Sequence, residues 1–103
     1  MKQAGITGLD PTRQQQLHAL FDDQPQLEAV WLFGSRALGR YREGSDIDLC
    51  LEGEGFTHRD HLRLMAAIDD LLMPWQVDLV LKQHMPADLL DHVNRVGLCI
   101  WRR

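Results

Sequence analysis

The fold is decided by residues 27–51, LEAVWLFGSRALGRYREGSDIDLCL. Residues 27–33 are apolar and rich in strand-forming types, and a glycine cuts the run off, which predicts a buried strand. Residues 46–51 alternate, with three aliphatic side chains on one face and two aspartates and a cysteine on the other, so a second strand is expected there. Between the strands we expect a glycine-serine turn and a short helical segment at residues 36–39.

The rest of the chain continues as an alternation of helices and strands. Asp10 can cap a first helix, Pro11 suits its first turn, and the apolar spacing ends near residues 22–25. The later elements are predicted as a helix from residue 57 to about residue 72, a strand at residues 76–82, a helix at residues 86–97 and a strand at residues 98–101. The helix that starts at residue 57 is expected to bury Leu64, Met65, Ile68, Leu71 and Leu72. This order predicts the α/β (α+β) class, a small mixed sheet of about four strands flanked by helices.

Length and composition agree with a single domain at residues 1–103, since 45% of the residues are hydrophobic and 25% are charged. No stretch has the roughly 20 apolar residues that cross a bilayer. Residues 1–10 lack the basic and apolar regions of a signal peptide, so we expect a cytoplasmic protein without membrane contact. Cys50 and Cys99 lie far apart within apolar segments, which predicts two small buried core residues.

The charge distribution argues against a protein that mainly coats nucleic acid. The net charge is -4, whereas such binding depends on Lys and Arg residues that neutralise phosphates. Arg36, Arg40 and Arg42 nevertheless lie close together in the sequence. A local anion site is therefore expected on an otherwise acidic chain.

Asp46 and Asp48 form the first part of a candidate metal site. Carboxylates at positions i and i+2 of a strand point to the same side with Cβ atoms roughly 6 to 7 Å apart, and they repel each other unless a cation lies between them. Such oxygen ligands suit Mg²⁺, which usually binds one or two carboxylates together with substrate phosphates. Asp78 lies between apolar neighbours in the third predicted strand, so its burial calls for a metal or a basic neighbour.

Gly34 and Ser35 supply the features that a phosphate ligand needs. A glycine directly after a strand lets the backbone approach a ligand closely, and N–H groups at the start of a following helix attract anions. Ser35 adds a hydroxyl donor, and the three arginines offer forked donors for phosphate oxygens. Each feature alone has a plain alternative. A Gly-Ser pair often forms an ordinary turn, an Asp-x-Asp pair at the start of a strand is often a solvated edge or a cap, and arginines often form weak surface ion pairs.

The joint spacing of these residues resembles a family signature. The segment 34–49, GSRALGRYREGSDIDL, is similar to the Gly-Ser, ten residues, Asp-x-Asp signature of the DNA polymerase beta-like nucleotidyltransferase superfamily. It looks most like the minimal MNT-type group, the MntA-like antitoxins of HEPN/MNT pairs. The resemblance covers residues 27–81, and both ends more loosely. It implies the polymerase beta-like nucleotidyltransferase fold.

The resemblance also implies a role for each residue of the motif. The catalytic and metal-binding acids would be Asp46, Asp48 and Asp78. The nucleotide-binding residues would be Gly34, Ser35, Arg36, Arg42 and Ser45. Two Mg²⁺ ions are expected with ATP as the substrate, and Asp78 would either complete the second metal site or act as the base. No motif in the chain specifies the base of the nucleotide.

Members of the MNT group typically pair with a helical HEPN-type protein, and in toxin-antitoxin versions the MNT chain is the antitoxin that adenylylates the toxin. Little sequence remains after the core elements for an acceptor-binding lobe, so a second chain is expected to supply it in a hetero-oligomer. Trp75 and Trp101 lie near predicted element ends, where a partner or the nucleotide base can reach them. Two alternatives stay open: a non-catalytic antitoxin that neutralises its partner by contact, and a nucleotidyltransferase that acts on a small molecule with a separate substrate-binding subunit.

Overall fold

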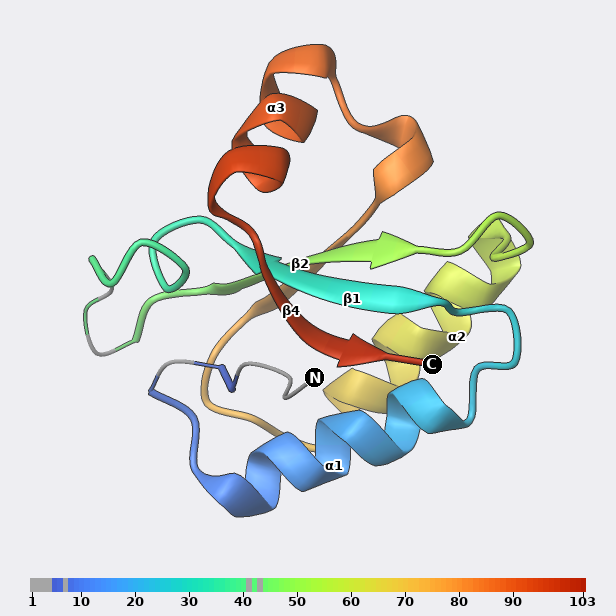
Figure 1. Ribbon diagram of the computed structural model, residues 1–103. Helices are drawn as coiled ribbons and strands as arrows, with labels where there is room; N and C mark the ends of the chain where they lie inside the picture. The colour runs from blue at the N-terminus through green and yellow to red at the C-terminus, as the bar shows by residue number, and fades with distance from the viewer. Residues whose placement is uncertain (1–4, 7, 41, 43) are drawn as a thin grey trace.

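The computed structural model describes residues 5–6, 8–40, 42 and 44–103, and these form one four-stranded sheet with three α-helices (Figure 1). The elements in chain order are α1 (Pro11–Asp22), β1 (Ala29–Phe33), β2 (Ile47–Glu52), α2 (His58–Asp69), β3 (Val77–Leu81), the 3-10 helix η1 (Lys82–His84), α3 (Ala87–Val96) and β4 (Leu98–Arg102). This arrangement confirms the predicted class. The prediction that no signal peptide is present concerns residues 1–10. Of these, residues 1–4 and 7 lie outside the described residues.

The helices lie on both faces of the sheet, with α3 above the strands and α1 and α2 below them in Figure 1. The larger core lies on the side of α1 and α2 and includes the fully buried Phe21 and Leu64. A smaller cluster of Phe33, Cys50 and Val93 packs between the sheet and α3. Within the described residues, no helix is long and apolar enough to cross a membrane.

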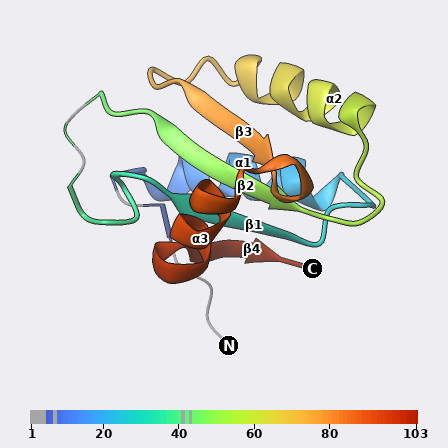
Figure 2. The same cartoon turned by 90° about the horizontal axis from the view of Figure 1, so that it is seen from above.

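Strand pairing brings the ends of three strands side by side. The strand order is β3-β2-β1-β4. β1 pairs antiparallel with β2, so Phe33 lies opposite Asp48. β2 pairs in parallel with β3, so Asp48 lies opposite Asp78, and α2 is the crossover connection that a parallel pair requires. Figure 2 shows the strands in this order, with α2 beside β3.

Local sequence signals account for the starts of two helices. Asp10 accepts a hydrogen bond from the Arg13 amide at 2.9 Å, and Pro11 opens α1. Thr57 and Asp60 form a capping box at α2, in which the side chain of each accepts a hydrogen bond from the backbone N–H of the other. These caps satisfy N–H groups of the first turn that have no partner within the helix.

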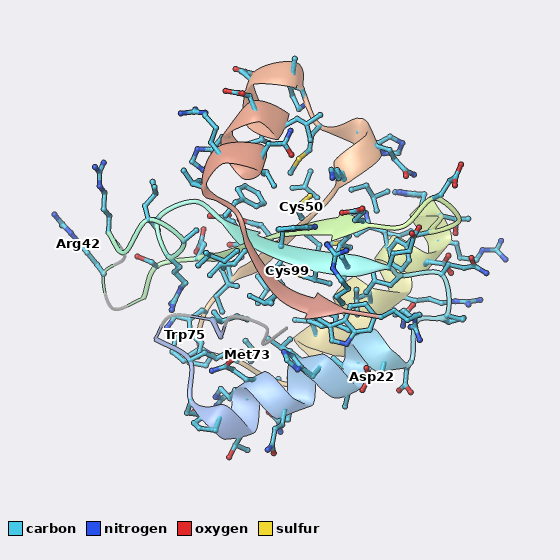
Figure 3. The ribbon with its side chains drawn as sticks, viewed as in Figure 1. Asp22, Arg42, Cys50, Met73, Trp75 and Cys99 are labelled. Atoms are coloured by element: carbon cyan, nitrogen blue, oxygen red, sulfur yellow. The ribbon has the colours of Figure 1, made fainter. Side chains whose placement is uncertain are left out.

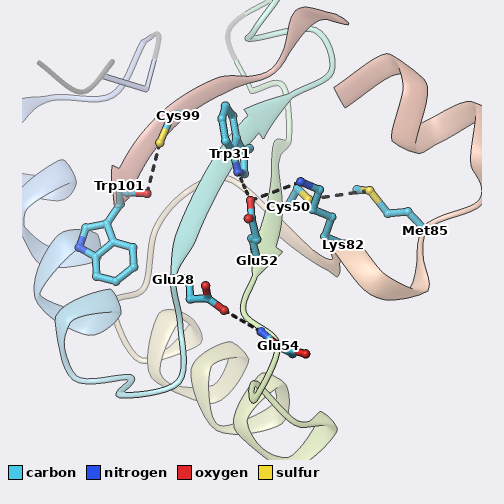
Figure 4. A network of polar contacts seen from close by, with 9 residues as sticks. All are labelled: Glu28, Trp31, Cys50, Glu52, Glu54, Lys82, Met85, Cys99 and Trp101. Atoms are coloured by element: carbon cyan, nitrogen blue, oxygen red, sulfur yellow. Dashed lines mark hydrogen bonds and ion pairs between the residues drawn. The ribbon is translucent and has the colours of Figure 1, made fainter. Parts of the chain in front are cut away.

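A polar network ties β1 to β2 and η1 on the α3 face of the sheet (Figure 4). The Trp31 indole donates to Glu52 at 2.9 Å, and the Lys82 ammonium lies 3.4 Å from the same carboxylate oxygen. Burial opposes the ionisation of Glu52, but the Trp31 hydrogen bond and the positive charges of Lys82 and Arg102 outweigh it, so the pKa of Glu52 is lowered. The network therefore stabilises the sheet with a charged carboxylate.

Residues 34–39, directly after β1, form a turn, so the short helix predicted at residues 36–39 is wrong. The Leu38 amide donates to the Gly34 carbonyl at 3.2 Å, as in a helix, but the Arg40 amide reaches back to the Ser35 carbonyl at 2.9 Å. This longer step interrupts the helical hydrogen-bond repeat. Gly39, with a φ of +72°, supplies the left-handed conformation near the end of the turn.

Two of the five residues predicted as the buried stripe of α2 are exposed. Leu64 and Ile68 are buried as expected, but Met65 is 39% and Leu72 is 84% exposed. Leu72 lies beyond the end of α2 and has a φ of 52°, so its side chain does not continue the buried face of the helix. The helix is shorter than its apolar pattern indicates, because the pattern continues into the turn before β3.

Trp101 is buried, which contradicts the prediction that a partner or the nucleotide base can reach it. Its indole donates to Asp22 at 2.9 Å and joins β4 to the end of α1. The prediction for the cysteines is half right, since Cys50 is fully buried and Cys99 is only partly buried. Figures 3 and 4 show the two thiols on different strands of the sheet.

Candidate active site

Asp48 and Asp78 lie side by side on the α3 face of the sheet. They are paired residues of the parallel strands β2 and β3, and Phe33 of β1 is the next residue in the same row. The alternation that places Ile47 and Leu49 in the larger core turns Asp48 to the opposite face. The structure thus brings together two of the three acids that the sequence indicates.

Asp46 precedes β2 and is exposed. Its negative charge acts on Asp48, two residues further along the chain. Among the described residues, no three His, Cys, Asp or Glu side chains are arranged to cage a metal ion. The acids therefore form a close pair with a third carboxylate nearby.

The electrostatics of the pair favour a bound cation. The pKa of Asp48 is raised, first by burial, then by the negative charges of Asp78 and Asp46, and also by a hydrogen bond with the Asp78 carboxyl group. A divalent cation between the carboxylates removes this mutual repulsion and favours their charged forms. The hard oxygen donors of Asp48 and Asp78 fit Mg²⁺.

Gly34 brings the backbone of the turn against the acids. Its φ is +76°, and a Cβ atom at this position would collide with the Asp48 carboxylate. Glycine is therefore required both by the conformation and by the close approach. Ser35 follows as a half-buried residue whose carbonyl accepts from the Arg40 amide, so the predicted Gly-Ser turn lies directly beside Asp48.

Arg36 is buried inside the connection between β1 and β2, with 2% of its surface exposed. Its guanidinium donates to the Ser45 carbonyl at 2.7 and 3.3 Å and lies 5.4 Å from the centre of the Trp75 ring. The Arg13 guanidinium of α1 lies 5.9 Å from the same ring. These contacts make Arg36 part of the internal structure of the loop, whereas the sequence indicates a phosphate contact.

The other two arginines of the motif are exposed. Figure 3 shows Arg42 projecting from the loop, away from the sheet. The Arg42 amide donates to the Ser45 hydroxyl at 2.8 Å, so this hydroxyl also takes part in closing the loop. The structure does not gather Arg36, Arg40 and Arg42 into one anion site.

Two polar contacts of the site are absent from the predictions made on the sequence. Gln76 donates to Asp78 at 2.9 Å, and His92 accepts from the Gly34 amide at 3.3 Å. Strand periodicity indicates the first contact, because Gln76 and Asp78 are two residues apart and point to the same side. His92 lies 58 residues from Gly34, so no local pattern points to the second contact.

The acids open into a cleft of about 650 Å³. Asp48, Asp78 and Leu89 line it on the α3 side, and it continues past the edge strand β3 to Trp75 and Met65. Ligand-binding clefts commonly measure about 300 to 1,000 Å³. The cleft has both charged and apolar walls, which suits a ligand with a phosphate part and a less polar part.

The fold and these residues define a nucleotidyltransferase of the polymerase beta type. The family model described as polymerase beta, nucleotidyltransferase matches residues 15–103, and the chain belongs to this family. It is similar to the Probable protein adenylyltransferase MntA of Haemophilus influenzae, with 43% identity over 74 residues, which cover 69% of this chain and 63% of that protein. The chain thus spans less than two thirds of the length of this curated relative.

Two solved structures share the fold. A chain of a toxin-antitoxin crystal structure with AMP-PNP is 25% identical, with a TM-score of 0.71 over 87% of this chain and 73% of that one. A candidate minimal nucleotidyltransferase is 34% identical, with a TM-score of 0.67 over 84% of this chain and 87% of that one. These similarities confirm the predicted polymerase beta-like nucleotidyltransferase fold.

Proposed function

We propose that this chain is a Mg²⁺-dependent adenylyltransferase that moves AMP from ATP to a hydroxyl group of a partner protein. The observation that carries the proposal is the Asp48–Asp78 pair directly beside the turn at Gly34. Family membership and the similarity to a protein named as a protein adenylyltransferase support the same activity.

Each residue of the site has a role in this proposal. Asp48 and Asp78, together with Asp46, would hold the two Mg²⁺ ions. Bound Mg²⁺ would supply the positive charge that orients the triphosphate and stabilises the leaving pyrophosphate. The Gly34 amide and the Ser35 hydroxyl donate to phosphate oxygens.

The three remaining residues of the motif act from the loop. The exposed Arg42 would contact the outer phosphates, and its forked donors suit phosphate oxygens. Arg36 and Ser45 act indirectly, because the Arg36 guanidinium donates to the Ser45 carbonyl and so holds the loop that follows the Gly-Ser turn.

The reaction is an in-line displacement at the α-phosphate. The acceptor hydroxyl oxygen forms a bond to the α-phosphorus while the bond to the oxygen that bridges the α- and β-phosphates breaks, so pyrophosphate leaves. The proton of the hydroxyl passes to a carboxylate, for which Asp78 is the candidate base. Gln76 keeps one Asp78 oxygen oriented through its 2.9 Å hydrogen bond.

The proposed acceptor is a helical HEPN-type toxin in the cytoplasm, with this chain as its antitoxin. The similar chain from a toxin-antitoxin structure with AMP-PNP supports this partner. The cleft that holds Asp48 and Asp78 is lined by residues of the sheet, α2 and α3, and the acceptor hydroxyl group would enter it. A second chain can therefore present its hydroxyl group beside Asp78.

Labelling with ATP tests the activity. The purified chain is incubated with Mg²⁺, α-labelled ATP and the helical protein encoded next to it. We expect transfer of label to that protein, loss of transfer on chelation of Mg²⁺, and loss of transfer in Asp48→Asn. Asp23→Asn is the matched control, because Asp23 is exposed at the end of α1, on the opposite face of the sheet from the acid pair. Labelling by Asp48→Asn at the parent rate would contradict the proposal.

One observation favours a second function, a binding subunit that neutralises its partner by contact alone. Within the described residues, no three acids are arranged to hold a metal ion together. The same arrangement is expected of a site that binds a partner without catalysis. The same variant separates the two functions. If Asp48→Asn still neutralises the partner as well as the parent does, contact is sufficient and the transfer reaction is not what silences the toxin.

A further inference from the structure

His92 connects α3 to the turn of the site. Its Nε2 atom accepts a hydrogen bond from the Gly34 amide at 3.3 Å. Its ring stands edge-on to Phe33, with 6.3 Å between the ring centroids and an angle of 79° between the ring planes. The side chain is half-buried, so its position is set by packing as well as by the hydrogen bond.

The contact with Gly34 has a consequence for phosphate binding, and this step rests on the proposed function. A phosphate oxygen that accepts from the Gly34 amide must lie about 2.9 Å from that nitrogen. It then approaches the space next to Nε2, which already accepts from the same N–H group. Two acceptors cannot share one donor at full strength, so either the imidazole moves away or its nitrogen becomes a donor.

Histidine can make this change without leaving its place. A neutral imidazole has one donor nitrogen and one acceptor nitrogen, and the proton can be carried by either. In the structure Nε2 is the acceptor. With an oxygen beside it, the tautomer that carries the proton on Nε2 donates to that oxygen while the Gly34 amide donates to the same phosphate.

We propose that His92 is a further nucleotide-binding residue, which holds the Gly34 amide in place before binding and donates to a phosphate oxygen of the nucleotide afterwards. The position fits the site, because Gly34 runs directly against the Asp48 carboxylate. It also supplies a donor on the α3 side, whereas Arg36 is buried within the loop.

Two substitutions separate a phosphate contact from packing. His92→Phe keeps an aromatic ring against Phe33 but has no polar atom, and His92→Gln keeps a donor and an acceptor at the end of a side chain of similar reach. Affinity for MgATP is measured by calorimetry for both variants and the parent. We expect His92→Phe to bind MgATP roughly tenfold more weakly, as the loss of one hydrogen bond to a charged group indicates, and His92→Gln to recover most of the affinity.

Three measurements keep the outcomes distinct. Thermal unfolding without nucleotide should place His92→Phe close to the parent, which separates binding from folding. Binding of adenosine, which has no phosphate, should be the same in both proteins. If His92→Phe binds MgATP as tightly as the parent, or more tightly, His92 is only a competitor for the Gly34 amide and the inference is wrong. If the parent itself binds no MgATP, it is the proposed function that fails.

Discussion

At the scale of single residues, Gly34 is the position at which backbone conformation and site chemistry meet. Its φ of +76° disfavours any side chain, and the Asp48 carboxylate occupies the space that a Cβ atom needs. Gly39 has a similar φ of +72°, but no atom lies within 4 Å of the Cβ position there. The two glycines therefore separate backbone strain from a steric effect on the acids.

We expect Gly34→Ala to destabilise the protein by at least about 1 to 2 kcal/mol, the usual cost of a left-handed conformation. It should also lower the transfer rate by about 100-fold, because displacement of Asp48 misplaces the reacting groups. Gly39→Ala should show a similar loss of stability with a transfer rate near that of the parent. Urea unfolding and the labelling assay measure both effects, and equal rates for the two variants would argue against a role for Gly34 beside Asp48.

Cys50 shows the effect of burial on a single ionisable group. The thiol lies in the small core between the sheet and α3, 3.8 Å from the Met85 sulfur. Burial raises the pKa of Cys50 to about 11, and the charge of Lys82 opposes this only in part. The native protein therefore holds the neutral thiol well above the pH at which an unfolded chain would release its proton.

This raised pKa predicts a pH dependence of stability. A thiol whose pKa is higher in the folded state stabilises the protein fully below the pKa of the unfolded chain and loses that contribution as the pH rises towards about 11. Between pH 9 and 11 the Cys50 contribution to unfolding free energy should fall by an amount on the order of 2 kcal/mol. Cys50→Ala should lack this part of the decline, and Cys99→Ala should keep it. Thermal unfolding across this pH range measures the difference.

At the scale of elements, the parallel pair β2 and β3 creates the site, and α2 connects the pair. α2 begins at the capping box of Thr57 and Asp60. The pKa of Asp60 is lowered, first because it accepts from the Thr57 backbone amide, so this cap is made by the charged carboxylate. The start of the crossover helix is thereby fixed by two residues close in sequence.

Thr57→Ala should lower the unfolding free energy by about 1 kcal/mol, the typical value for loss of an N-cap side chain. Transfer activity should stay near that of the parent, since the cap lies at the start of the crossover and not at Asp78. Thr12→Ala, at an exposed position of α1, is the control and should have a small effect. Urea unfolding of both variants tests the cap, and equal stability of the two would contradict it.

At the scale of the whole molecule, the two faces of the sheet have different functions. The face covered by α1 and α2 holds the larger core, and the face of α3 holds the acid pair and the cleft. A raised pKa at Asp48 means that the ionised side chain destabilises the metal-free protein at neutral pH. Stability is thus reduced at the site where the proposed activity requires negative charge.

Asp48→Asn should consequently raise the unfolding temperature of the metal-free protein at pH 7 while it removes transfer activity. The unfolding temperature rises because the pKa of Asp48 is raised in the folded protein, so the parent loses stability as the pH rises through that pKa. The asparagine side chain of the variant does not ionise and avoids this loss. Mg²⁺ with ATP should stabilise the parent by about 2.7 kcal/mol at a concentration 100 times the dissociation constant and should have little effect on the variant. Calorimetric scans with and without Mg²⁺ and ATP test both statements. A variant less stable than the parent under metal-free conditions would oppose the electrostatic argument.

The sequence alone determined most of the helices and strands and which of their faces are buried, but not the turn at residues 34–39 or the end of α2. Alternation in residues 46–51 separated the buried aliphatic side chains from Asp48, and local residues such as Thr57 and Pro11 fixed where helices begin. These features depend on neighbours within a few positions, and period-two and helical spacing record them directly. The spacing of Gly34 and Ser35 from Asp46 and Asp48 also indicated the family, which the match over residues 15–103 confirms.

Only the tertiary structure decided which of these residues meet. The pairing of Asp48 with Asp78 depends on the register of two parallel strands, and the contact of His92 with Gly34 joins residues far apart in the chain. The inward turn of Arg36 is equally invisible in the sequence, since the Ser45 carbonyl and the Trp75 ring that receive it are brought there by the fold. Spacing fixes the direction of a side chain relative to its own element, whereas its partner depends on how the elements pack.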